Sequence, residues 1–321
     1  MRAHLPHILE KEKDMETEAA DVKMDPFMKA IKAIHSVIAV SDVERAETLD
    51  KQRASHERLS KLVTPTVGVS YTKEEVKGIN TEWAVADFPH RDKPVILYCH
   101  GGGYTSGGLG YAGMLAGKMV MHTGLSVYSF EYRLAPENPY PSAIEDAVVV
   151  WDHLMYLGYG ADEVIVLGDS AGGNLALELT LVLKSQRRQL PAALILMSPW
   201  TDMTAGGASY EKYKDTDPML TVEYVYGARN AYAGCETDYT NPSLSPLFAD
   251  LTGMPPTLIQ VGSNEILRSD SENLYKKLHK NGCITKLQVF TGGWHVFQVL
   301  PVPKAAKALD DVADFIRELG L

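Results

Sequence analysis

The sequence predicts an α/β fold in which a mostly parallel central sheet is covered by helices on both faces. Beyond about residue 95, short apolar runs alternate with longer stretches of helical periodicity. Nearly continuous apolar character is typical of parallel strands that are buried on both faces. The composition agrees with this fold class, because 45% of the 321 residues are hydrophobic and 22% are charged, as in a globular protein with a sizeable core.

The first 66 residues are expected to be helical. Apolar residues recur at helical spacing in "DPFMKAIKAIHSVIAV". The next stretch, "SDVERAETLDKQRASHERLSKLV", opens with Ser41 and Glu44, a capping-box pair. Such amphipathic helices usually pack their apolar stripe on their own protein rather than on a membrane.

The remaining elements follow in order. Two early strands, "VGVSY" and "NTEWAVADF", are expected to pair antiparallel. The later strands are "PVILYC", "SVYSFEY", "EVIVLG", "AALILMS", "PTLIQVG" and "TKLQVF". The helices are "YAGMLAGKMVMHTG", "SAIEDAVVVWDHLMYLG", "AGGNLALELTLVLKSQ", "SDSENLYKKLHKNG" and "VPKAAKALDDVADFIREL". Residues 203–250 break the alternation and are expected to form an insertion, with helical structure around "TVEYVYGARNAYAG".

Charge and composition exclude several classes of function. The formal net charge is −10 and no strongly basic face is evident, so nucleic acid is not an expected partner. No apolar run approaches the roughly 20 residues of a membrane span, and the charged N-terminus lacks the apolar core of a signal peptide. We therefore expect a cytoplasmic protein. Cys99, Cys235 and Cys283 match neither a disulfide framework nor a zinc site, and no metal is expected.

The segment "GDSAG", residues 168–172, predicts a nucleophilic serine. It is a G-x-S-x-G pattern between a predicted strand and a predicted helix, where a tight turn exposes the Ser170 hydroxyl. The N-terminus of the following helix points its amides at the same place.

A serine hydroxyl needs a base, and the base needs a carboxylate to orient it. His295 follows the last predicted strand in "TGGWHVFQ", in the chain order serine, acid, histidine. Two acids precede it in "LIQVGSNEILRSD". Glu265 lies in the loop after the strand and is favoured. Asp270 stands where an acid supports a helix N-terminus, and it remains the alternative.

The run "HGGG", residues 100–103, predicts a site for negative charge. Attack of a serine on a carbonyl creates an oxyanion, which backbone amides stabilise where side chains do not block the approach. Gly102 and Gly103 are the expected donors, with Ala171 as the residue after the serine. Neither glycine-rich nucleotide-binding pattern is present in this run. His100 is expected to support the loop by hydrogen bonding.

Seven motifs follow one another along the chain: "HGGGY", "YRLAPENPYPSAIEDA", "GDSAGGNLAL", "SPWTD", "DPML", "SPLFADLTGMPPTLIQVGSNEILRSD" and "GWHVFQ". Together they resemble the hormone-sensitive-lipase-like branch of the α/β-hydrolases, the group of bacterial carboxylesterases and acetyl-hydrolases. The resemblance implies a catalytic domain over 67–321 and a helical cap built from 1–66 and the insertion at about 203–250. It also implies the triad Ser170, Glu265 and His295. Many relatives carry Asp in place of Glu265, which keeps Asp270 open.

The expected activity is hydrolysis of short acyl esters, from acetyl to about hexanoyl, with no metal or organic cofactor. The alternatives are lactone hydrolysis, acyl transfer on the same triad, or a non-catalytic ligand receptor of the same fold. Aromatic side chains near the motifs are candidates to line the substrate pocket: Tyr104, Trp200, Tyr224 and Trp294. Some family members form dimers through the edge of the last strand, here "TKLQVF".

Overall fold

The computed structural model describes residues 29, 49–51, 53–54 and 66–321. Its centre is an eight-stranded sheet with the order β1-β2-β4-β3-β5-β6-β7-β8. The strands are β1 (Val69–Val76), β2 (Ile79–Ala86), β3 (Val95–Cys99), β4 (Val127–Phe130), β5 (Val164–Asp169), β6 (Ala193–Met197), β7 (Thr257–Gly262) and β8 (Thr285–Phe290). β2 pairs antiparallel with β1 and β4, and all other neighbours are parallel. The predicted fold class and the predicted strands are confirmed.

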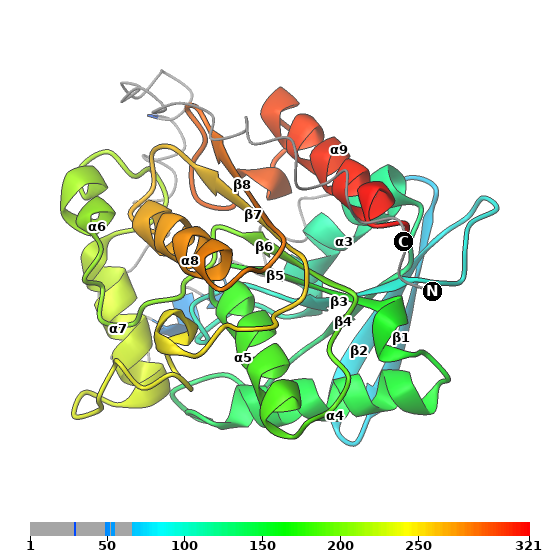
Figure 1. The fold of residues 1–321 in the computed structure, drawn as a ribbon, viewed down its shortest axis with the longest axis horizontal. Coiled ribbons are helices and arrows are strands. Elements are labelled where there is room, and N and C mark those ends of the chain that lie inside the picture. Colours follow the sequence, from blue (N-terminus) through cyan, green and yellow to red (C-terminus); the bar gives the residue numbers. More distant parts are fainter. Residues whose placement is uncertain (1–28, 30–48, 52, 55–65) are drawn as a thin grey trace.

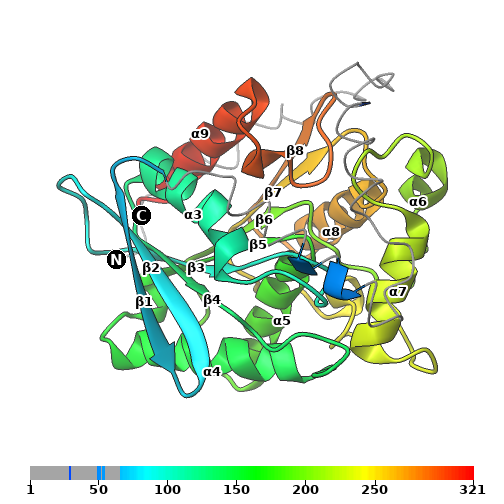
Figure 2. The same cartoon turned by 180° about the vertical axis from the view of Figure 1, so that it is seen from behind.

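Helices cover both faces of this sheet (Figure 1, and from behind in Figure 2). The α-helices after β2 are α3 (Leu109–Thr123), α4 (Ser142–Tyr156), α5 (Ala171–Ser185), α6 (Ala208–Tyr213), α7 (Val222–Ala233), α8 (Arg268–Lys280) and α9 (Pro303–Glu318). Within residues 66–321, the short 3₁₀ helices are η1 (Ala161–Glu163), η2 (Pro246–Phe248) and η3 (Phe297–Val299). α3 and α9 pack on one face, and α4, α5 and α8 pack on the other.

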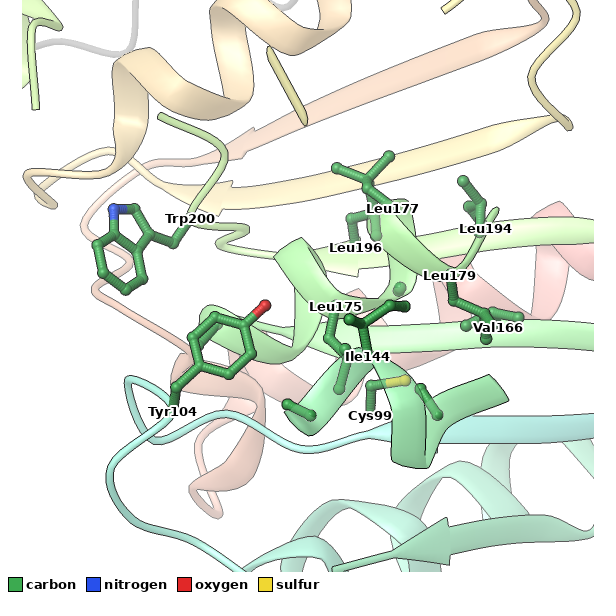
Figure 3. Packing of buried hydrophobic residues seen from close by; sticks show 14 of the residues in the cluster. Cys99, Tyr104, Ile144, Val166, Leu175, Leu177, Leu179, Leu194, Leu196 and Trp200 are labelled. Carbon is green, nitrogen blue, oxygen red and sulfur yellow. The ribbon is translucent and has the colours of Figure 1, made fainter. Parts of the chain in front are cut away.

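The core forms because successive strand residues point to opposite faces of the sheet. In β3, Ile96 and Tyr98 pack with α3 and α9, whereas Leu97 and Cys99 pack with α4 and α5. Figure 3 shows leucines of α5 against Val166 and its neighbours on the second face. Both faces are covered, which is why the parallel strands read as continuous apolar runs. β8, at the edge, is half-buried along its length.

The segment between β6 and β7 contains α6, α7 and η2. α7 lies where the sequence predicts a helix, and Figure 1 shows α6 and α7 at the end of the molecule opposite to β1. The helices predicted within residues 1–66 lie almost entirely outside the described residues. In the described part, Arg53 donates to the carbonyls of Thr105 and Ala135 and pairs with Glu137.

Glu178, in the middle of α5, is a buried acid whose effect on stability is testable. Among the described residues, neither of its carboxylate oxygens has a hydrogen-bond partner, and burial raises its pKa well above the usual range. Because this group stays neutral in the folded protein, the free energy of unfolding has its full value below the unfolded pKa. It falls as the pH rises from the unfolded pKa toward the folded pKa.

We therefore expect Glu178→Gln to gain stability over the wild type as the pH rises above about 4, by up to about 1.4 kcal/mol per pH unit. Urea denaturation of both proteins at several pH values measures this difference. A difference that does not change with pH would contradict the assignment of a neutral, buried carboxyl group.

Candidate active site

Ser170 lies in the turn between β5 and α5 with φ 53° and ψ −122°, a backbone conformation that side chains rarely adopt. Gly168 and Gly172, on either side of it, cannot be replaced by a residue with a side chain, because a Cβ would clash with the backbone. A Cβ at Gly168 would lie 2.1 Å from the carbonyl oxygen of Gly172, and a Cβ at Gly172 would lie 2.0 Å from that of Cys99. The strand–turn–helix that the G-x-S-x-G pattern predicts is therefore present, and packing against the end of β3 explains its second glycine.

His295, in the loop after β8, is paired with Glu265, in the loop after β7. The His295 Nδ1 lies 3.0 Å from Glu265 Oε2, and the Glu265 side chain is fully buried. The other carboxylate oxygen, Oε1, accepts a hydrogen bond from the Gly262 amide. With Nδ1 held by the carboxylate, the remaining ring nitrogen, Nε2, is the one that can exchange a proton with a substrate or a nucleophile.

Ser198, the first residue after β6, is a contact of this pair that the sequence patterns do not single out. Its hydroxyl donates to Glu265 Oε1 at 2.9 Å and accepts from the Val296 amide at 3.2 Å. It thus joins the loop that carries Glu265, called the acid loop below, to the residue after His295. Its φ of 48° is a backbone feature that a sequence pattern does not reveal.

Asp270, the alternative acid, lies in the first turn of α8. Its Oδ2 accepts hydrogen bonds from the amides of Thr201 and Asp202, at 2.8 and 3.0 Å. Burial raises its pKa well above the usual range, and the nearby Asp202 raises it further. Asp270 therefore holds the loop after β6. In the described part of the chain, Glu265 is the acid whose carboxylate contacts His295.

The glycine run after β3 forms a tight turn in the left-handed region. Gly102 and Gly103 have φ values of 119° and 64°. A Cβ at Gly102 would lie 2.2 Å from the Ser106 carbonyl oxygen. In the described residues, the amides of Gly102, Gly103 and Ala171 donate no hydrogen bond, so they are available to a bound group.

Asp169 ties this glycine turn to the serine turn. Its Oδ1 accepts from the Gly101 amide at 2.8 Å and from the Tyr98 hydroxyl at 2.7 Å. Its Oδ2 accepts from the Tyr111 hydroxyl at 2.6 Å. Burial raises the pKa of this carboxyl, whereas the two hydroxyls and the amide act to lower it. Because Asp169 directly precedes Ser170, these bonds fix the two loops relative to each other.

The four predicted pocket residues differ in their surroundings. Tyr104 is fully buried, its ring stacks on Tyr232 at 3.7 Å, and its hydroxyl donates to Asn174. Trp200 and Trp294 are also buried, and each packs within an apolar cluster.

Tyr224 is half-buried, and its hydroxyl lies 2.6 Å from the position of a Cβ at Gly103. Of the four, Tyr224 is therefore the one that lies against the glycine turn.

His100 lies at the start of the glycine run and packs inside the protein. Its Nδ1 lies 2.7 Å from the Gly101 carbonyl oxygen, and its ring stacks on Tyr132. Within residues 66–321 and the few described before them, no three His, Cys, Asp or Glu side chains are grouped to hold a metal ion. In the same part of the chain, no helix combines the length and apolar character needed to cross a bilayer.

The mostly parallel sheet, the serine turn after β5 and the buried histidine–glutamate pair define the class of α/β-hydrolases. A family model described as the alpha/beta hydrolase fold matches residues 96–299. The chain is 38% identical over 229 residues to an esterase of Acinetobacter venetianus, covering 71% of this chain and 76% of that protein. It is 35% identical over 230 residues to an acetyl-hydrolase of Streptomyces hygroscopicus, with the same coverage.

Similar solved structures show to which branch of the α/β-hydrolase family the chain belongs. An esterase from the bacterial hormone-sensitive lipase family shares 31% identity and a TM-score of 0.85, covering 93% of this chain and 99% of that one. EstE7, a homologue of hormone-sensitive lipase from a metagenome library, shares 32% identity and a TM-score of 0.83 with the same coverage. The chain therefore belongs to the hormone-sensitive-lipase-like branch of the α/β-hydrolase family, which confirms the resemblance seen in its motifs.

Proposed function

We propose that this carboxylic ester hydrolase acts through a triad of Ser170, His295 and Glu265. The observation that carries the proposal is the buried hydrogen bond between His295 Nδ1 and Glu265 Oε2. That bond directs Nε2 away from the carboxylate, and Ser170 stands in the strained turn that this chemistry requires.

The reaction then has two halves. Ser170 Oγ attacks the ester carbonyl carbon while His295 Nε2 takes the hydroxyl proton, and the carbonyl oxygen becomes an oxyanion. The amides of Gly102, Gly103 and Ala171 donate to that oxyanion. His295 returns the proton to the leaving alcohol, and an acyl-enzyme remains. Water, deprotonated by His295, then attacks the acyl-enzyme. His295 gives that proton to Ser170 Oγ as the carboxylic acid leaves, which restores the free serine.

The proposed substrates are esters of short acyl groups, from acetyl to about hexanoyl. The name of the Streptomyces relative, an acetyl-hydrolase, supports a small acyl group. A second neighbour, EstE5, at 30% identity and a TM-score of 0.83, has a crystal structure soaked with p-nitrophenyl butyrate. We propose that residues 1–66 and the insertion at about 203–250 form a cap that limits chain length, with Tyr224 at its contact with the glycine turn.

Lactone opening and transfer to another alcohol use the same acyl-enzyme, so both remain alternatives within this proposal. A non-catalytic receptor is less well supported, because its site would not need the His295–Glu265 hydrogen bond. The cytoplasmic location and the pairing of two copies through the edge of β8 stay predictions.

Initial hydrolysis rates on p-nitrophenyl esters from acetate to palmitate test the substrate class. We expect kcat/KM to be highest for acetate to hexanoate and to fall for longer chains, because the cap confines the acyl group. A maximum at long chains would contradict the confined pocket. The absence of cleavage of any ester would favour the receptor alternative.

A further inference from the structure

Asp217, in the insertion between α6 and α7, is a buried acid that the proposed mechanism does not use. Only 2% of its surface is exposed. Its Oδ1 accepts hydrogen bonds from the amides of Met219 and Leu220, at 2.8 and 3.0 Å. Its own amide donates to the carbonyl of Tyr213 at the end of α6. The carboxylate is therefore held in one orientation by its own loop.

The second oxygen of Asp217 reaches the loop that carries the triad acid. Asp217 Oδ2 accepts a hydrogen bond of 2.8 Å from the amide of Ile266, the residue directly after Glu265. This bond joins residues 49 positions apart in the chain, and it is buried. A shift of the insertion relative to the sheet would therefore be transmitted to the backbone beside Glu265.

The charge of Asp217 also acts on the triad. Burial is the main cause that raises its pKa, to about 6, and it is opposed by the amides of Leu220 and Ile266. The charged groups that face it are Glu265, which raises its pKa, and His295, which lowers it. Asp217 is therefore electrostatically coupled to both members of the Glu265–His295 pair.

We propose that Asp217 is a positioning residue that couples the docking of the insertion to the orientation of the Glu265–His295 pair. The inference rests on the proposed triad. The bond to the Ile266 amide fixes the backbone from which Glu265 reaches His295. The negative charge supports the imidazolium that forms when His295 takes the serine proton.

Asp217→Asn removes the charge, and its single carbonyl oxygen cannot serve all three amides. We expect kcat for p-nitrophenyl butyrate to fall about tenfold. We also expect KM to change by less than about twofold, because the loss acts on the orientation of the base and not on substrate binding. Asp217→Ser removes the same charge without placing an NH₂ group against Ile266, and it serves as the second variant.

Asp202→Asn is the matched control. Asp202 is also a buried acid, but its Oδ1 accepts from the amide and hydroxyl of Thr204 in its own loop and makes no bond to the acid loop. We expect this control to leave the chemical shift of the His295 Nδ1 proton at its wild-type value.

The ¹H NMR signal of the His295 Nδ1 proton, which faces Glu265, reports the geometry of the pair without turnover. Its chemical shift should change in Asp217→Asn and Asp217→Ser, and should stay in place in Asp202→Asn. An unchanged chemical shift in the folded Asp217 variants, with only lower stability or kcat, would overturn the proposal. Because this spectrum does not need hydrolysis, it separates failure of this inference from failure of the proposed function.

Discussion

Replacing Ser170 with alanine is expected to lower kcat/KM for short p-nitrophenyl esters by about 10⁴- to 10⁶-fold while leaving the fold intact. The acyl-enzyme cannot form without the hydroxyl, so the amides around the oxyanion contribute only a residual rate. Alanine keeps the β-carbon in the strained turn at φ 53°, so the backbone there meets the same constraint as in the wild type. Steady-state kinetics measures the loss, and circular dichroism with thermal unfolding checks the fold.

Ser185→Ala is the matched control for this experiment. Ser185 lies at the end of the same helix, α5, where its exposed hydroxyl donates to the carbonyl of Val182. We expect its kcat/KM to stay within about twofold of the wild type, since surface substitutions far from a site have small effects. If Ser170→Ala kept activity within tenfold of the wild type, Ser170 could not be the nucleophile.

The sheet could be predicted because burial on both faces imposes a local pattern. Each run such as "PVILYC" or "AALILMS" became a strand, since a strand covered on two sides has no polar face. The turn at Ser170 could be predicted equally well. Gly168 and Gly172 are required by contacts within a few residues and with the end of the neighbouring strand, and such packing leaves a short motif.

Other features depend on contacts that no short motif records. Ser198 and Asp217 reach the acid loop from other parts of the chain, at separations of 67 and 49 positions. Nothing in "SPWTD" or "DPML" indicates which side chain ends beside Glu265. The pocket prediction was limited for the same reason, because an aromatic near a motif can be packed, as Tyr104 is, or lie against the glycine turn, as Tyr224 does.

The two candidate acids after β7 give the second large effect, and their variants test the choice that the sequence left open. Glu265 lies in the loop and Asp270 in the first turn of α8. Glu265→Gln is expected to lower kcat about 10⁴-fold. The carboxylate accepts from His295 with one oxygen and from Ser198 and Gly262 with the other. An amide cannot accept on both sides, so either its NH₂ group faces those donors or it turns toward His295 and favours the wrong tautomer.

Asp270→Asn, in contrast, is expected to keep kcat within about tenfold of the wild type. The raised pKa of Asp270 favours the neutral form that asparagine imitates, and an amide oxygen can accept from the backbone of Thr201 and Asp202 as the carboxylate does. The kcat of both folded variants is the decisive readout. A large loss of kcat in folded Asp270→Asn, together with near-normal turnover in Glu265→Gln, would reverse the assignment of the triad acid. The opposite result would mean that the contact with His295, rather than the position of an acid at a helix N-terminus, determines which carboxylate serves the base.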